Sequence, residues 1–193
     1  MVFERQVLSL ALIEKELFEL YTNLLERVED VTPKTLLSYI ATDSLKHSTI
    51  LAAIIDEVDG SKTKESDCDI TILYNKGLIR TLSKDIALRS VISIDELLSL
   101  IGTLAGFENL LFTEYKKAFH LEFAGVRHYG SDRSKEDEEL NIFTLIVGDE
   151  ERHQRILGEM AVLCDRKLSF KRSAPAVKYQ NPDSWYVPPR GSR

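Results

Sequence analysis

Two residues three positions apart, Glu150 and His153, have the types and the spacing to bind a metal ion. They lie in the stretch 145–160, whose apolar residues recur at the spacing of one buried helix face, so both side chains point toward a core. A carboxylate facing a core costs on the order of several kcal/mol unless it is paired, protonated or bound to a metal. No Lys or Arg lies on this stripe, and Asp149 and Arg152 point elsewhere.

Two other apolar stripes are each interrupted by one glutamate. In the first, Glu14 breaks the line and Tyr21 follows seven residues later. In the second, Glu108 breaks the line and Tyr115 follows at the same distance. The polar residues therefore recur with one pattern in two distant parts of the chain.

A fourth stripe carries Ser44 and His47 at the positions where the stripe over 145–160 carries Glu150 and His153. Taken alone, His47 is better explained as a core histidine bonded to a neighbour. Asp43 lies beside this stripe, but Ser44 is nearer its centre on an ideal helix. This pair repeats the spacing of Glu150 and His153.

The repeat predicts two helical hairpins, related by a pseudo-twofold axis, whose polar residues meet midway along a shared core. Three anions cannot share a dry core uncompensated, so a cation of charge +2 or more is the simplest resolution. Carboxylates with imidazoles suit iron, manganese or zinc. The candidate ligands are Glu14, His47, Glu108, Glu150 and His153.

Four long helices must position these residues. The periodicity predicts them over 2–29, 33–58, from Ser93 to a turn at 125–133, and over 134–165. Thr32 and Pro33 form an expected N-cap and first helical residue, and Ser93 with Glu96 forms a capping box. Residues 61–92 are expected to be a long connection with one or two short helices. Such a connection allows a crossover that joins the two hairpins in parallel sense.

The 193 residues predict one all-α domain over 1–165 and a basic, proline-rich tail over 166–193. The net charge is −6, and because the last 29 residues carry seven basic and two acidic side chains, the remainder carries −11. Such an acidic body argues against nucleic-acid binding. The chain has no run of eighteen apolar residues, so no membrane span is expected. Cys68 and Cys164 form no C-x-x-C pair and indicate a reducing, cytoplasmic compartment.

The tail holds four of the five prolines and is expected to be extended. Two states of it are consistent with its composition: a disordered end, or a segment draped over this bundle or a neighbour's. In the second, Tyr179, Trp185 and Tyr186 would be the anchors. We expect a homo-oligomer, most simply a dimer.

The arrangement resembles the ferritin-like superfamily, most closely its rubrerythrin-like members, over residues 3–60 and 93–164. In this family, one Glu comes from each of two helices and Glu-x-x-His from each of the other two. The resemblance implies an up-down-down-up four-helix bundle with a long crossover between its second and third helices. It also implies a carboxylate-bridged metal pair that activates dioxygen or peroxide. Tyr21 and Tyr115 match tyrosines that hydrogen-bond to metal ligands there, although ordinary core aromatics would show the same pattern.

Ser44 departs from the family pattern, which has a bridging Glu at this place. Two divalent ions bring +4, and three carboxylates leave an excess of +1, which a low-dielectric site disfavours. A water, a hydroxide or an exogenous carboxylate would fill the gap, or Asp43 would move in after a local helix adjustment. A single bound metal is the other possibility.

The expected function is redox chemistry at iron, di-iron or mononuclear, with manganese or zinc as alternative metals. The small-molecule partner would be Fe2+, which is oxidised, or a peroxide or dioxygen, which is reduced. Two alternatives stay open: a metal-sequestering bundle without turnover, and an interaction module whose polar core sets the helix register.

Overall fold

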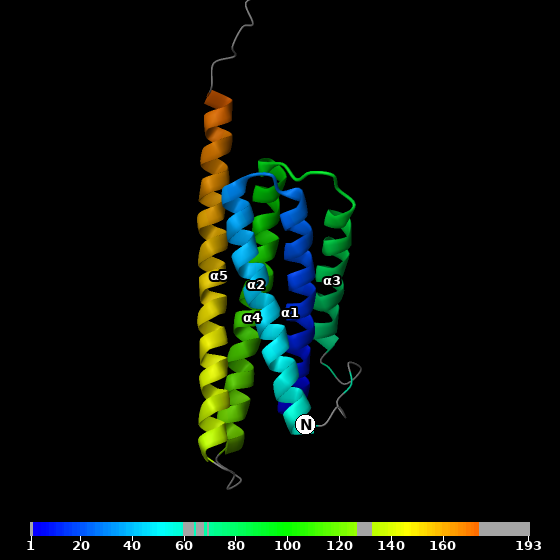
Figure 1. Cartoon of the computed structure of the whole chain (residues 1–193), viewed down its shortest axis with the longest axis vertical. Helices are drawn as coiled ribbons and strands as arrows, with labels where there is room; N and C mark the ends of the chain where they lie inside the picture. Colours follow the sequence, from blue (N-terminus) through cyan, green and yellow to red (C-terminus); the bar gives the residue numbers. More distant parts are fainter. Residues whose placement is uncertain (1, 60–63, 65–67, 69, 127–132, 174–193) are drawn as a thin grey trace, which may run out of the picture.

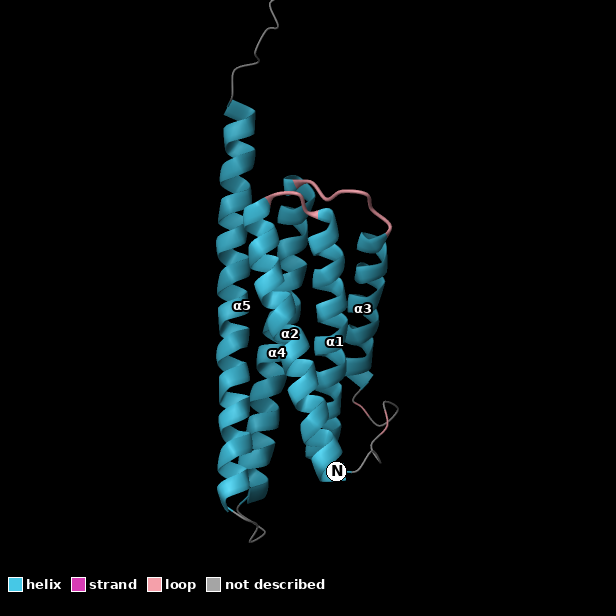
Figure 2. Ribbon diagram, in the orientation of Figure 1, coloured by secondary structure: helices cyan, strands magenta, loops and turns pink. Residues whose placement is uncertain are grey.

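A computed structural model of the chain describes residues 2–59, 64, 68, 70–126 and 133–173. Its helices are α1 (Val2–Arg27), α2 (Val31–Asp59), α3 (Ile70–Ala87), α4 (Ile94–Val126) and α5 (Arg133–Ser173). Figure 2 shows helices joined by loops, and the predicted all-α class is confirmed for the described chain. Within these residues, no helix has the length and apolarity needed to cross a lipid bilayer.

The helices lie side by side along one long axis (Figure 1). The chain ascends in α1, descends in α2, ascends in α3, descends in α4 and ascends in α5. Hydrogen bonds between the helices agree with these directions. Between α1 and α4, the earlier residue of one helix bonds to the later residue of the other, as in antiparallel neighbours, and the same holds between α2 and α5. Helices α1 and α2 thus form one hairpin, α4 and α5 form another, and α3 returns the chain alongside α1.

Each hairpin helix buries the apolar stripe that the sequence predicts. Leu10, Leu17 and Leu24 of α1 lie at the spacing of two helical turns, and all three are fully buried. Leu111 of α4 and Leu157 of α5 are also fully buried. Because the polar residues of interest lie on the same stripes, this core carries them inward along with the leucines.

The start of α4 agrees with the prediction and the start of α2 does not. The backbone N–H of Ser93 donates to Glu96 Oε2 (2.8 Å), and the backbone N–H of Glu96 donates to Ser93 Oγ (3.3 Å), which is the predicted capping box. Helix α2 begins at Val31, and the N–H of Thr32 donates to Asp30 Oδ1 (3.2 Å). Asp30 is therefore its cap, since proline is tolerated anywhere in a first turn that lacks N–H partners.

In the part of the connection that the structure describes, one helix is present, α3, of 18 residues. The Arg80 guanidinium forms an ion pair with the buried Glu16 of α1. At the far end, the Arg27 guanidinium donates to the carbonyl oxygens of Ala87 (2.7 Å) and Arg89 (3.0 Å). These bonds hold α3 along the outer side of α1, so the crossover is a packed helix.

Helix α5 continues to Ser173, beyond the expected end at Asp165, and projects past the other helices (Figure 1). The prediction of an extended segment is therefore wrong for residues 166–173. No proline lies between Asp165 and Pro175 to end the helix, and Lys167 in this segment pairs with Asp30. The rest of the expected tail, with its aromatic anchors, lies outside the described residues.

Candidate metal centre

The five predicted ligands meet in the interior, and each is 0 % exposed. Glu14 comes from α1, His47 from α2, Glu108 from α4, and Glu150 with His153 from α5. They form two groups, Glu14–His47–Glu150 and Glu108–Glu150–His153, whose ligand atoms lie within 4.8 Å of one another. Glu150 belongs to both groups. The described residues thus contain two buried N/O clusters that can hold a metal ion and share one carboxylate.

The two histidines face these glutamates through the same ring nitrogen. His47 Nδ1 lies 3.0 Å from Glu14 Oε1 and 3.3 Å from Glu150 Oε1. His153 Nδ1 lies 3.0 Å from Glu108 Oε2 and 3.7 Å from Glu150 Oε1. Equivalent atoms of the two halves therefore converge on Glu150.

The two tyrosines are hydrogen-bonded to these glutamates and are not simple core aromatics. The Tyr115 hydroxyl on α4 donates to Glu14 Oε1 on α1 (2.6 Å), and the Tyr21 hydroxyl on α1 donates to Glu108 Oε1 on α4. Burial, together with the charges of these glutamates, raises both tyrosine pKa values well above the usual range. The hydroxyls consequently stay protonated as donors.

The second ring nitrogen of each histidine contacts an aspartate on the partner helix, α5 for His47 and α2 for His153. His47 Nε2 lies 3.2 Å from Asp149 Oδ2, and His153 Nε2 lies 3.3 Å from Asp43 Oδ2. The expectation that Asp149 points away from the site is therefore wrong. The sequence contains a signal for this contact, because an aspartate precedes each histidine by four residues, at 43 and at 149.

Lys46 links these two aspartates at the solvent side of the centre. Its ammonium donates to Asp43 Oδ1 (2.7 Å) and to Asp149 Oδ2 (3.0 Å). Arg152 donates to Asp149 Oδ1 (2.7 Å) and to the Tyr39 hydroxyl (2.6 Å). Asp43 is thus held by Lys46 and His153 and is not placed to replace the missing carboxylate at position 44.

The pKa of the inner carboxylate, Glu150, and the pKa values of the outer carboxylates, Asp43 and Asp149, shift in opposite directions. Burial raises the pKa of Glu150 well above its usual range, and the charges of Glu14 and Glu108 raise it further. Burial also opposes ionisation of Asp43 and Asp149, but hydrogen bonds from Lys46 and from the histidines lower both pKa values. Lys46 and Arg152 compensate the outer aspartates, whereas Glu150 has only the two imidazoles beside it.

His153 responds to the same surroundings. Burial alone would lower its pKa, but the hydrogen bond and charge of Glu108, together with the bond to Asp43, raise it above the ordinary value. The imidazole is therefore drawn toward the charged form by two carboxylates.

Four buried polar atoms in the centre lack a hydrogen-bond partner: Glu14 Oε2, Glu150 Oε1, Glu150 Oε2 and Ser44 Oγ. Buried polar groups in folded proteins are nearly always paired. Carboxylate oxygens without donors, beside imidazole nitrogens, have the chemistry of metal ligands. The residues present therefore fit a bound metal.

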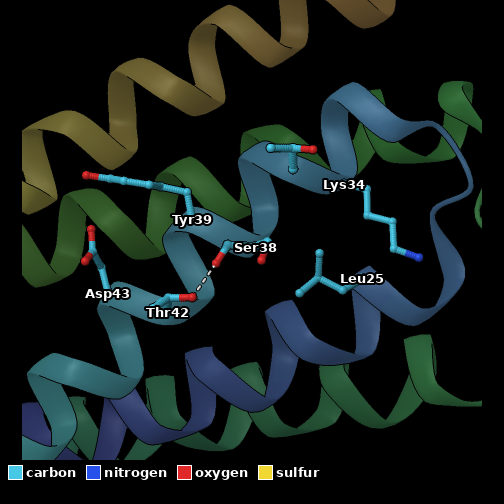
Figure 3. A pocket seen from close by; sticks show the side chains of 7 residues that line it. Leu25, Lys34, Ser38, Tyr39, Thr42 and Asp43 are labelled. Atoms are coloured by element: carbon cyan, nitrogen blue, oxygen red, sulfur yellow. Dashed lines mark hydrogen bonds between the residues drawn. The ribbon is translucent and has the colours of Figure 1, made fainter.

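A pocket of about 580 Å³ has Asp43 in its wall, and Figure 3 shows the side chains that line it. One wall residue comes from α1 and the rest come from α2: Leu25, Lys34, Thr35, Ser38, Tyr39, Thr42 and Asp43. Asp43 contacts His153, and the Tyr39 ring lies 6.4 Å from the His153 ring, measured between centroids. A small molecule in this pocket would thus be separated from His153 by the side chain of Asp43.

No family model, curated relative or solved structure matches the chain.

Proposed function

We propose that the chain is a ferritin-like, rubrerythrin-like metal protein that binds two ions across Glu150 and carries out redox chemistry there. The observation that carries this proposal is the pair of buried ligand groups with one shared carboxylate. The directions of α1, α2, α4 and α5 support the proposal, because an up-down-down-up bundle with α3 as its crossover would have the same order of directions.

Charge supports a divalent pair over a metal-free polar core. Glu14, Glu108 and Glu150 are fully buried together, and both oxygens of Glu150 lack a hydrogen-bond donor. The nearby cations Lys46 and Arg152 bond to aspartates on the solvent side. A polar core that only set the helix register would satisfy these atoms within the protein.

Each residue then has a distinct task. Glu14 with His47 would hold one ion, Glu108 with His153 the other, and Glu150 both. The tyrosines fix the single glutamates, and the outer aspartates orient the imidazoles, as partners of metal-bound histidines do. Iron or manganese bound there would supply redox chemistry in which electrons pass from Fe2+, which is oxidised, to dioxygen or peroxide, which is reduced. The pocket at Asp43 gives a small substrate a way to the edge of the centre.

One observation favours a second function, metal sequestration without turnover. Because Ser44 contributes no carboxylate, each ion would have three protein ligands and the pair would keep an excess positive charge. Oxygen-coupled Fe2+ oxidation distinguishes the two functions, since a sequestering protein binds iron without accelerating its oxidation.

The test is metal content followed by Fe2+ oxidation, measured on the wild type, on Glu150→Gln and on Glu16→Gln. Glu16 is a matched control because it is also a buried glutamate, but it is paired with Arg80. We expect up to two ions per chain in the wild type and in Glu16→Gln, and loss of both ions in Glu150→Gln. Wild-type protein without bound transition metal, even after incubation with Fe2+, would overturn the proposal.

A further inference from the structure

Ser44 is the position where the internal symmetry of the centre fails. The segment 43–47 reads Asp-Ser-Leu-Lys-His, and the segment 149–153 reads Asp-Glu-Glu-Arg-His. The two aspartates have equivalent contacts with the opposite histidines, and the two histidines have equivalent contacts with Glu14 and Glu108. The third residues, Leu45 and Glu151, also differ but are exposed, so among the buried positions only the second breaks the match: Ser44 takes the place that Glu150 has in the other half.

The Ser44 hydroxyl lacks a partner although it is fully buried. Residues three apart share a helix face, so Ser44 lies on the same side of α2 as His47. Three further buried atoms of the centre lack a partner, namely Glu14 Oε2 and the two oxygens of Glu150. A buried hydroxyl ordinarily finds a partner, so this one is free to donate to a ligand from outside the chain.

Charge indicates the class of this ligand. Two divalent ions bring +4, and the three inner glutamates leave +1. One monoanion restores neutrality, and a small carboxylate has the two oxygens that the missing glutamate side chain would have supplied. The nearby pocket ends at Asp43, the residue before Ser44, and Lys34 contributes a positive charge to its wall.

We propose that Ser44 marks a binding position for a small exogenous monocarboxylate, which completes the coordination of the two ions while the Ser44 hydroxyl donates a hydrogen bond to it. This inference rests on the proposed function, because the ligand binds only to the metal-loaded centre. The chain would thereby use an exchangeable acid where other bundles of this architecture have a fixed side chain.

The test is a calorimetric and optical titration of the cobalt(II)-loaded full chain with formate. We expect one formate per chain in the wild type, with a change in the cobalt absorption bands. Ser44→Ala should weaken formate binding about five- to tenfold, the effect of one lost hydrogen bond. Ser44→Glu should abolish formate binding and tighten cobalt, since its own carboxylate takes the position.

Ser48→Ala is the matched control. Ser48 lies one turn further along α2 and donates to the Ala11 carbonyl oxygen (3.0 Å), away from the centre, so its loss should leave formate affinity unchanged. If Ser44→Glu fails to fold, Ser44→Ala decides alone, and a formate affinity equal to that of the wild type overturns the inference.

Failure of the Ser44 inference and failure of the proposed function give different results in this titration. Protein that binds two cobalt ions but gives no formate response overturns the Ser44 inference and leaves the proposed function standing. Protein that binds no more cobalt than Glu150→Gln does overturns both.

Discussion

Two buried glutamates, Glu16 and Glu150, show how surroundings determine the role of one residue type. Glu16 is 4 % exposed and its carboxylate is paired with Arg80, so it fastens α3 to α1. Glu150 is 0 % exposed, has no hydrogen-bond donor, and faces two further carboxylates. The first stabilises the fold as it stands, whereas the second lowers stability until a cation compensates it.

Glu150→Gln should therefore stabilise the metal-free protein while removing its metal affinity. The amide has nearly the same shape without the charge, so the variant no longer bears the free-energy cost of placing this ionisable carboxyl in the core at neutral pH. Glu16→Gln should lose about 1 kcal/mol, because it breaks an ion pair. Urea denaturation in the presence of a chelator measures both. A metal-free Glu150→Gln protein less stable than the wild type would contradict this account.

The stability of the metal-free protein should fall as the pH rises above the ordinary glutamate pKa of 4.5. Between that value and the raised folded-state pKa, the native protein keeps a proton that the unfolded chain has lost. His153 acts in the same direction above its ordinary 6.5, whereas the lowered pKa values of Asp43 and Asp149 cost stability only as the pH falls below 3.8.

Urea midpoints measured across this range test the pH dependence. Glu150→Gln should show a flatter decline above pH 4.5, and saturating metal should remove much of it, because the bound ion replaces the protons. A wild-type stability that increases between pH 5 and pH 8 without metal would be incompatible with a buried, uncompensated carboxylate.

Among the helices, the seam between α2 and α5 carries the polar contacts that orient the centre. Lys46 of α2 reaches Asp149 of α5, Arg152 of α5 reaches Tyr39 of α2, and each histidine contacts the aspartate opposite. Because the ligands of α2 and α5 are aimed by residues on the other helix, the seam couples the two hairpins to metal affinity.

Asp149→Asn should weaken metal binding by about tenfold to a hundredfold, the usual effect of losing the partner of a ligating histidine. The amide keeps the volume but removes the charge that orients His47 and that Lys46 and Arg152 compensate. Competition with a coloured chelator measures the affinity. Asp165→Asn, an exposed change on the same helix, is the control and should behave as the wild type.

Taken as a unit, the molecule is two hairpins whose polar centre draws ligands from α1, α2, α4 and α5. A bound ion would thus connect elements that are distant in the chain, and it would bind the folded state far better than the unfolded chain. Metal binding should be coupled to global stability.

Removal of the metal should lower the melting temperature of the wild type. At a free-ion concentration a hundredfold above Kd, binding to the native state alone adds about 2.7 kcal/mol to the free energy of unfolding. Differential scanning calorimetry with and without a chelator measures the shift. Glu150→Gln, which cannot share a ligand between two ions, should melt at one temperature in both conditions, and an identical chelator response in the two proteins would refute the coupling.

The four long helices and the five inner residues could be predicted from the sequence, because both depend on local periodicity. A repeat near 3.6 residues determines which side chains share a face, and a glutamate on an apolar face is unusual wherever that face packs. Glu14, Glu108 and Glu150 were accordingly recognisable one by one. That the three meet required the further observation that the two halves of the chain repeat.

Only the tertiary structure decided the contacts across the α2–α5 seam. Asp149 lies off the apolar stripe of its own helix, and its partner, His47, is 102 residues away in the chain. The four-residue spacing of aspartate and histidine on each helix marks these residues but does not show that each aspartate contacts the histidine of the other helix. The cap of α2, the length of α3 and the end of α5 were equally undetermined, since several residues could serve at each boundary and packing selects among them. Helical periodicity is a property of neighbours in sequence, whereas the partner of a side chain at the edge of a stripe depends on how two helices are placed together.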